Sequence, residues 1–160
     1  MILILMGVSG AGKSSVGGAL AEELHWRFTD ADEFHSAANV AKMHSGVPLT
    51  DEDRAPWLQS LHSAIERYLA SGENVVLACS ALKAAYRKVL LVDPQVKLVY
   101  LRGSFDLIAK RLASRQGHYM NPHLLRSQFD ALEEPADGLI VDASFPVAEI
   151  VKQIRTAFGV

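Results

Sequence analysis

Cysteine is nearly absent from this chain, because Cys79 is the only one among 160 residues. A single cysteine excludes an intrachain disulfide and a zinc site built from several cysteines. Long apolar runs are also absent near the N-terminus, where residues 1–6 are apolar and Gly7 follows. A membrane-spanning helix needs about 20 apolar residues, and a signal peptide needs a basic region before its apolar one. We therefore expect a soluble cytoplasmic protein with no membrane partner.

An excess of positive charge is lacking as well. The chain has 16 Lys and Arg against 18 Asp and Glu, which gives a formal net charge of -2. Proteins that bind nucleic acid through bulk charge are basic, so we expect no nucleic-acid partner. Hydrophobic residues make up 49% of the chain and charged residues 21%, which is typical of a globular protein rather than a disordered one. The length suits a single domain over residues 1–160.

Short apolar runs alternate with longer segments of helical periodicity. The runs consist mainly of Val, Ile and Leu without polar alternation, which is typical of central strands in a parallel sheet covered on both faces. This pattern predicts an α/β fold, a three-layer sandwich around a five-stranded parallel sheet. Strands are expected at Ile2–Met6, Arg27–Asp30, Val75–Ala78, Lys97–Leu101 and Leu139–Asp142. Helices are expected at Lys13–Glu23, Asp51–Ala70, Ala81–Leu91, Ser104–Ala113, Pro122–Leu132 and Pro146–Phe158.

A glycine-rich segment follows the first predicted strand. Residues 7–14 read Gly-Val-Ser-Gly-Ala-Gly-Lys-Ser, which matches the P-loop pattern G-x-x-x-x-G-K-[ST]. The backbone N–H groups of such a loop converge on phosphate oxygens, and the next helix adds its positive dipole end. Lys13 is placed to neutralise the β- and γ-phosphates of ATP, and the Ser14 hydroxyl to bind Mg²⁺. The predicted ATP contacts here are Gly7, Val8, Ser9, Gly10, Ala11, Gly12, Lys13, Ser14 and Ser15.

A P-loop alone does not distinguish kinases from GTPases and motors. The predicted strand Val75–Ala78 leads into Cys79-Ser80 rather than Asp, so a separate Walker-B strand is missing. No guanine-reading Asn-Lys-x-Asp sequence occurs either. At this length, these two absences favour a small-molecule kinase. A nucleotide-binding regulatory module without catalytic activity is the alternative from another functional class.

Two carboxylates, Asp30 and Asp32, come at the end of the second predicted strand. In open parallel sheets, the ligand crevice lies beyond the carboxyl ends of the strands. Asp30 is predicted to hold Mg²⁺, directly or through water. Asp32 is predicted to accept a hydrogen bond from the attacking hydroxyl, as a base or an orienting group. The competing interpretation is an ordinary helix N-cap in a solvated turn.

Several stretches of the chain match the pattern of one known family. They are the P-loop, Asp30-Ala-Asp-Glu-Phe-His35, Asn39, Lys42-Met43, Gly46-Val-Pro-Leu-Thr-Asp-Glu-Asp-Arg54, Pro56-Trp57-Leu58, Cys79-Ser-Ala-Leu-Lys83, Tyr86-Arg87, Tyr100-Leu-Arg-Gly103, Arg115-Gln-Gly-His118 and Ser127-Gln-Phe-Asp-Ala-Leu-Glu-Glu-Pro135. The most specific of these are Gly-x-Pro-Leu-x-Asp-x-Asp-Arg and Cys-Ser-Ala-Leu-Lys. Over nearly its whole length, the chain therefore resembles the gluconokinases, small P-loop kinases that are related in form to shikimate kinase and nucleoside monophosphate kinases. Alanine stands at position 31, where that family often has glycine.

The resemblance implies ATP-dependent phosphorylation of the 6-hydroxyl of D-gluconate, on a nucleoside-monophosphate-kinase-like fold with a helical lid. It also implies a homodimer. A sugar acid brings a carboxylate and several hydroxyls, so its site requires cations together with carboxylates or amides. For Arg54 an ion pair within its own helix is the alternative, and for Lys83 and Arg87 a solvated helix face. The predicted substrate contacts are Asp32, His35, Arg54, Lys83 and Arg87.

Two arginines four residues apart, Arg111 and Arg115, lead into a segment that resembles the mobile lid of related kinases. A lid excludes water from the transferring phosphoryl group. Arg115 is predicted to stabilise that group and to form the catalytic set with Lys13 and Asp32, whereas Arg111 is predicted to lie nearer the adenine of ATP. The lid is expected at about 115–122, and the acceptor-binding segment at about 35–58. Shikimate kinase is the nearest rival, although a glycine-rich loop is expected there in place of residues 79–83.

Overall fold

The computed structural model describes residues 1–114 and 122–160. Within these residues, the sheet is five-stranded and entirely parallel. The strands are arranged in the order β2-β3-β1-β4-β5. Four of the five have their predicted bounds, and β4 is one residue longer at each end. The strands are β1 Ile2–Met6, β2 Arg27–Asp30, β3 Val75–Ala78, β4 Val96–Arg102 and β5 Leu139–Asp142.

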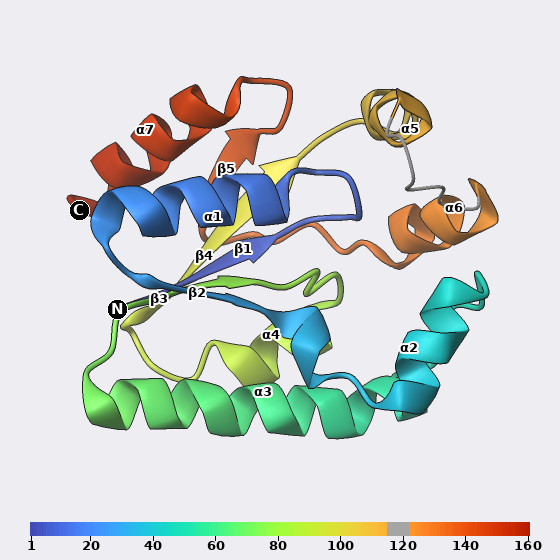
Figure 1. Ribbon diagram of the computed structural model, residues 1–160, viewed down its shortest axis with the longest axis horizontal. Coiled ribbons are helices and arrows are strands. Elements are labelled where there is room, and N and C mark those ends of the chain that lie inside the picture. The colour runs from blue at the N-terminus through green and yellow to red at the C-terminus, as the bar shows by residue number, and fades with distance from the viewer. Residues whose placement is uncertain (115–121) are drawn as a thin grey trace.

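Helices cover both faces of this sheet, which confirms the predicted three-layer α/β fold. Figure 1 shows α1 and α7 on one face and α3 and α4 on the other, whereas α2, α5 and α6 lie toward the end of the sheet where the strands finish. Within the described residues, no helix is long and apolar enough to cross a lipid bilayer. The helices are α1 Lys13–Leu24, α2 Ala37–His44, α3 Asp51–Ser71, α4 Ala84–Leu90, α5 Phe105–Ser114, α6 Pro122–Ala131 and α7 Val147–Phe158, with a short 3₁₀ turn, η1, at Ala31–Phe34.

The central strand β1 has no polar face because both of its faces are buried. Successive side chains of a strand point to opposite faces of the sheet. Ile4 belongs to the core beneath α3, together with Leu61. Leu5 belongs to the core beneath α1 and α7, together with Leu20 and Ile150. This double burial fixes the position of the phosphate-loop segment that follows β1.

Two local features differ from the helices predicted from the sequence. Helix α2 lies in a segment for which no helix was expected. It has only eight residues, and Ser36 caps it by accepting a hydrogen bond from the backbone N–H of Asn39 at 3.1 Å. Helix α4 begins three residues later than predicted. Ala81 adopts a left-handed conformation with φ of 45°, and Lys83 is extended at the N-cap.

Helix α3 begins with a complete capping box. The backbone N–H of Asp53 donates to Oγ1 of Thr50, and the backbone N–H of Thr50 donates to Oδ2 of Asp53, both at 3.0 Å. We expect Thr50→Ala to lower the free energy of unfolding by about 1 kcal/mol, because it leaves a helix N–H without its partner. Urea denaturation measures this change. Thr156→Ala, at an exposed position in α7, is the control; equal midpoints for the two variants would contradict the prediction.

Candidate active site

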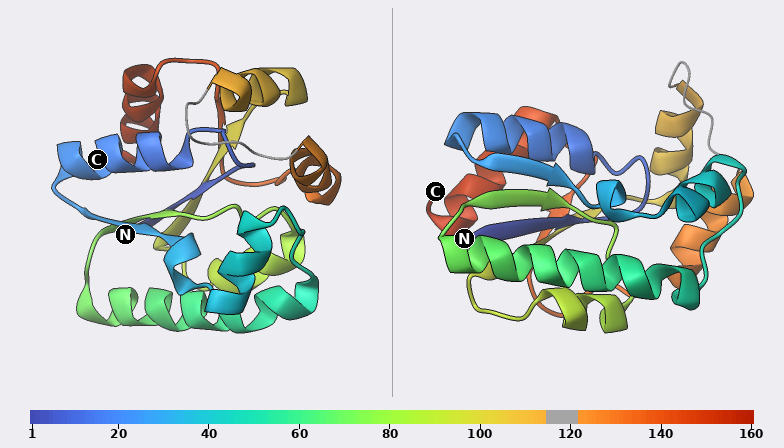
Figure 2. Two further views of the ribbon diagram at one scale, coloured as in Figure 1. Left: turned by 45° about the vertical axis from the view of Figure 1, so that its right-hand side comes forward. Right: turned by 60° about the horizontal axis from the view of Figure 1, so that its bottom comes forward.

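Three polar segments meet at one end of the sheet. Residues 7–12 follow β1, η1 follows β2, and residues 79–83 follow β3. The strands are parallel neighbours, so their carboxyl ends lie side by side. Figures 1 and 2 place α2 and α6 at this same end of the molecule. The candidate site is therefore built on loops that a rigid, buried sheet holds in place.

The phosphate loop connects β1 to the N-terminus of α1. Gly10 and Gly12 have φ values of 84° and 103°, a left-handed conformation that side chains rarely adopt. A Cβ atom at Gly10 would lie 3.1 Å from side-chain carbons of Ile108 and Leu112 in α5. Both the curl of the loop and its contact with α5 therefore require glycine at position 10.

Lys13 is folded back over this loop. Its Nζ donates to the carbonyl oxygen of Gly7 at 2.7 Å and to that of Val8 at 3.0 Å. Burial lowers the pKa of Lys13, and this effect is opposed chiefly by the negative charge of Asp32 and more weakly by that of Asp30. The ammonium group thus contacts the phosphate loop and lies within electrostatic reach of the two carboxylates.

Ser14 and Asp30, the two predicted metal ligands, face each other. The hydroxyl of Ser14 donates to Oδ2 of Asp30 at 3.4 Å. The other carboxylate oxygen of Asp30, Oδ1, accepts from the backbone N–H of Asp32 at 2.9 Å and caps η1. Asp30 is therefore an N-cap, as the competing interpretation had it, and it also turns one oxygen toward Ser14.

The Ser14–Asp30 pair fits Mg²⁺ better than a metal enclosed by protein. Across residues 1–114 and 122–160, no group of three or more His, Cys, Asp or Glu is arranged to hold a metal. Mg²⁺ requires oxygen ligands and usually takes only one or two from protein, with phosphate and water supplying the others. One hydroxyl and one carboxylate oxygen match that requirement.

Asp32 has an environment that favours its protonated form. Partial burial raises the pKa of Asp32, the nearby Asp30 carboxylate raises it further, and Lys13 acts in the opposite direction. The side chain still reaches solvent. A carboxylate whose pKa is raised in this way is better suited to accept a proton than an ordinary aspartate.

His35 is fixed beside Asp32 by aromatic stacking. Its backbone N–H donates to the carbonyl oxygen of Asp32 at 3.2 Å. Its ring lies parallel to that of Trp57, with centroids 4.4 Å apart and planes 9° apart. Trp57 is itself held by its indole N–H, which donates to the carbonyl oxygen of Ala31 at 2.7 Å. Burial, together with the positive charge of Arg54, lowers the pKa of His35 to about 4.

The predicted acceptor-binding cations Arg54 and Lys83 gather around Tyr86. The Arg54 guanidinium carbon is 5.6 Å from the Tyr86 ring centroid, and Lys83 Nζ is 5.7 Å from it. Nη1 of Arg54 donates to Leu49 O at 2.7 Å and to the Tyr86 hydroxyl at 3.3 Å, so the ion pair considered within its own helix is replaced by these contacts. Lys83 and the Tyr86 hydroxyl both donate to Oδ1 of Asp51. Sequence reasoning selected neither Tyr86 nor Asp51 as a site residue.

Arg87 has a different environment. It is only 7% exposed, so the solvated helix face considered from the sequence is wrong for this residue. Its Nη1 donates to the carbonyl oxygens of Ala81 at 2.9 Å and Leu82 at 3.1 Å. Arg87 therefore braces the turn that carries Lys83, and its predicted contact with substrate stays a prediction.

A cavity of about 270 Å³ lies between the phosphate loop, α5 and the start of α7. Gly12 and Ser15 line it on one side, and Arg111 lines it on another. The guanidinium of Arg111 donates to the carbonyl oxygen of Ala143, which holds it at the cavity wall. Phe145, 46% exposed, also lines the cavity and offers an apolar surface to a planar base. No motif or spacing in the sequence pointed to Phe145.

Helix α6 is attached to the phosphate loop by a pair of hydrogen bonds that the sequence did not predict. The backbone N–H of Ser9 donates to Oε1 of Gln128 at 2.7 Å, and Nε2 of Gln128 donates to the Ser9 hydroxyl at 3.0 Å. Just beyond α6, Oε1 of Glu133 accepts from the backbone N–H of Ala84 at 2.9 Å. Arg115, with residues 115–121 of the predicted lid, lies outside the described residues.

Known proteins similar to this chain are kinases. The family model described as "Shikimate kinase" matches residues 9–156. A "Probable gluconokinase" of Mus musculus is 49% identical over 153 residues, which cover 84% of this chain and 83% of the relative. The "Thermoresistant gluconokinase" of Escherichia coli (strain K12) is 43% identical, with 94% and 89% covered. The crystal structure of a gluconokinase from Sinorhizobium meliloti 1021 has a TM-score of 0.87 and 42% identity, covering 98% of this chain and 90% of that one.

Proposed function

We propose, because this chain belongs to the shikimate kinase family and within it to the gluconokinases, that it transfers the γ-phosphoryl group of ATP to the 6-hydroxyl of D-gluconate. The observation that carries this proposal is the row of functional side chains at the carboxyl ends of the strands. Lys13 interacts electrostatically with Asp32, and the backbone of Asp32 is hydrogen-bonded to that of His35. The positive charge of Arg54 in turn acts on the ring of His35. One end of the row suits phosphate and the other suits a sugar acid.

The phosphoryl end of the row consists of the loop and the two carboxylates. The O6–phosphorus bond forms, the bond from phosphorus to the β-phosphate oxygen breaks, and the O6 proton passes to Asp32. Lys13 and the N–H groups of residues 7–15 bind the phosphate oxygens, and Arg111 lies at the base-binding cavity. Mg²⁺, held by Ser14 and Asp30, would neutralise charge on the β- and γ-phosphate oxygens. Arg115 would add a positive charge that stabilises the transferring phosphoryl group.

The acceptor end of the row has cations for the gluconate carboxylate. We assign that carboxylate to Arg54 and Lys83, which share the ring of Tyr86, and the sugar hydroxyls to His35 and Asp32. Asp51 balances the charge of Lys83 when no acceptor is bound. Arg87 supports this end by fixing the turn that carries Lys83.

Arg54→Ala is expected to raise the KM for gluconate by about 10- to 100-fold, because a hydrogen bond to a charged group contributes roughly 1.5–3 kcal/mol. The KM for ATP should change little, because the residues that Arg54 contacts, Leu49 and Tyr86, do not belong to the phosphate loop. Steady-state ADP release measures both constants. Arg27→Ala is the matched control, because Arg27 begins β2 at the opposite end of the sheet and pairs with exposed Glu73. A change confined to the KM for ATP would show that Arg54 is misassigned.

Four further features belong to this proposal. Mg²⁺ is the metal that suits the Ser14–Asp30 oxygen pair. Residues 1–160 form one domain, in which the acceptor segment extends over about 35–58 and the lid over about 115–122. The reducing cytoplasm suits a chain whose one thiol, Cys79, is buried and has its pKa raised to about 12 by that burial. The homodimer rests on family resemblance.

The experiment that tests the function is ³¹P NMR of a reaction containing the protein, Mg²⁺, ATP and D-gluconate. The expected result is a phosphomonoester signal that matches 6-phospho-D-gluconate and grows at the same rate as ADP. ADP together with inorganic phosphate, and no phosphomonoester signal, would indicate ATP hydrolysis and would contradict the proposal.

A further inference from the structure

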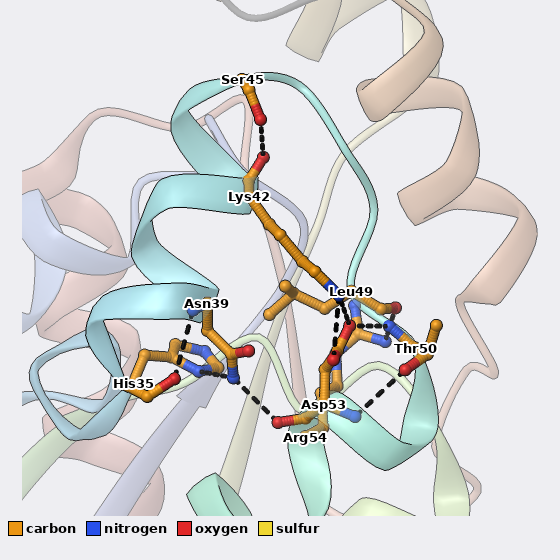
Figure 3. A network of polar contacts seen from close by, with 9 residues as sticks. His35, Asn39, Lys42, Ser45, Leu49, Thr50, Asp53 and Arg54 are labelled. Atoms are coloured by element: carbon orange, nitrogen blue, oxygen red, sulfur yellow. Dashed lines mark hydrogen bonds and ion pairs between the residues drawn. The ribbon is translucent and has the colours of Figure 1, made fainter.

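The imidazole of His35 contacts a neighbour on only one of its two nitrogens. Nδ1 lies 3.3 Å from Nδ2 of Asn39, on helix α2 (Figure 3). Nε2 has no hydrogen-bond partner among the described residues. Within that part of the chain, no buried side-chain nitrogen or oxygen lacks a partner, so Nε2 must reach solvent. The ring therefore turns one nitrogen toward protein and the other toward open space.

The orientation of the Asn39 amide is fixed by a second contact. Nδ2 of Asn39 donates to the backbone carbonyl oxygen of Asp53 at 2.8 Å (Figure 3). A carbonyl oxygen can only accept, so the nitrogen rather than the oxygen of the amide must face Asp53. The remaining N–H of the same nitrogen is directed at His35. Nδ1 of His35 must then be the acceptor, and the proton of the neutral ring must be on Nε2.

Asn39 is held firmly enough to impose this choice. It is 7% exposed, and its backbone N–H donates to the Ser36 hydroxyl at the start of α2. Lys42, one turn further along α2, forms an ion pair with the Asp53 carboxylate at 2.9 Å. Helices α2 and α3 are thus joined at two points on one residue, Asp53. These two contacts hold the Asn39 amide at a fixed position relative to the His35 ring.

We propose that Asn39 is a positioning residue that holds His35 in its Nε2–H tautomer, so that His35 donates a hydrogen bond from Nε2 to an oxygen of the acceptor substrate. The part about the acceptor rests on the proposed function, whereas the tautomer does not. A neutral donor fits a hydroxyl or carboxylate oxygen of a polyhydroxy acid. It leaves the proton-accepting role to Asp32.

The charged groups around the ring agree with a neutral donor. Arg54 approaches from α3, and its positive charge, together with burial, lowers the pKa of His35 to about 4. Trp57 covers one face of the ring from α3, and Asn39 approaches from α2. Asp32, on the same turn as His35, contacts the backbone N–H rather than the ring. The imidazole accordingly carries no positive charge at neutral pH.

The tautomer can be tested directly on the unliganded protein. Long-range ¹H–¹⁵N spectra of histidine-labelled protein distinguish a protonated ring nitrogen from an unprotonated one. The six histidines are separated by the loss of the His35 signals in His35→Gln. We expect Nε2 protonated and Nδ1 unprotonated, unchanged between about pH 5 and 8. Protonation of Nδ1 in that range would overturn the proposal.

The positioning role of Asn39 is tested with Asn39→Asp, which nearly preserves shape but replaces the donor by an acceptor. We expect the proton of His35 to appear on Nδ1 in this variant. An unchanged Nε2–H tautomer in a folded Asn39→Asp protein would refute the role of Asn39. Should this variant not fold, the tautomer in the parent protein still tests the proposal, because a proton on Nδ1 of His35 there is incompatible with an N–H donated by Asn39.

The donor role is tested by comparing His35→Gln with His35→Asn. The glutamine amide reaches the place of Nε2 and can donate there, whereas the asparagine amide reaches only the place of Nδ1. We expect His35→Gln to stay within about threefold of the parent KM for gluconate and His35→Asn to raise it about tenfold. His62→Gln is the control, since His62 lies further along α3 and contacts Glu66. Equal increases in the two His35 variants would overturn the donor role.

Failure of the proposed function can be distinguished from failure of the tautomer assignment, because the two are measured separately. Absence of gluconate turnover in the parent protein would contradict the proposed function and with it the acceptor part of the inference. The NMR spectra of the unliganded protein would still confirm or refute the tautomer that Asn39 imposes.

Discussion

Lys13→Ala is expected to reduce kcat by about 10²- to 10³-fold while the protein remains folded. The ammonium group contacts the phosphate loop and lies within electrostatic reach of the two carboxylates, where it neutralises charge that develops on the transferring phosphoryl group. Burial has already removed part of its water shell, so the group requires little reorganisation during the reaction. A coupled assay of ADP release at saturating substrates measures kcat.

The control for this variant is Lys152→Ala, because Lys152 is exposed on α7 and remote from the loop. Lys152→Ala should retain parental turnover, which separates the loss of a placed charge from a change in net charge. Circular dichroism of both variants establishes that they are folded. Parental kcat in a folded Lys13→Ala protein would remove Lys13 from the catalytic set.

Asp32→Ala is expected to reduce kcat by about 10²- to 10⁴-fold, the range for loss of a general base. Its pKa is raised by partial desolvation and by Asp30, so the carboxylate is a stronger base than an ordinary aspartate. Asp32→Asn should cause a comparable loss, because an amide preserves the shape but cannot take the O6 proton. Single-turnover kinetics with ATP and gluconate isolate the chemical step from product release.

Asp137→Asn removes one negative charge from an exposed loop and serves as the matched control. It should leave the single-turnover rate unchanged. If Asp32→Asn retained most of the parental rate while Asp32→Ala lost it, the side chain would orient the acceptor rather than accept its proton. If both retained it, Asp32 would have no part in the reaction.

Most of the fold was predictable because its central strands, β1 and β3, are fully buried and therefore apolar throughout. The central strand Ile2–Met6 consists of apolar residues alone, and four strand bounds were predicted to the residue. Helix α2 was not predicted because it is only eight residues long and depends on one local cap, Ser36. The start of α4 was placed too early because a left-handed Ala81 leaves no recognisable pattern in a sequence.

The same distinction applies to the site: residues in short local motifs were predictable, whereas residues joined by long-range contacts were not. Lys13, Ser14, Asp30 and Asp32 lie in or beside short motifs at strand ends, so the sequence indicated them directly. Tyr86 contacts Arg54 and Asp51, which lie 32 and 35 positions earlier, and Gln128 contacts Ser9, which lies 119 positions earlier. No periodicity or spacing within one chain reveals such contacts, because the intervening fold creates them.

The most direct test of the assigned activity is acceptor-dependent ADP release with Mg²⁺ and ATP. The acceptors to compare are D-gluconate, shikimate, other sugar acids and nucleoside monophosphates, at equal concentrations. We predict turnover with D-gluconate and none with shikimate or the nucleoside monophosphates. Turnover with shikimate but not gluconate would agree with a kinase fold but would contradict the assignment of Arg54 and Lys83 to a sugar acid. ATP binding without turnover of any acceptor would indicate a regulatory module instead of an enzyme.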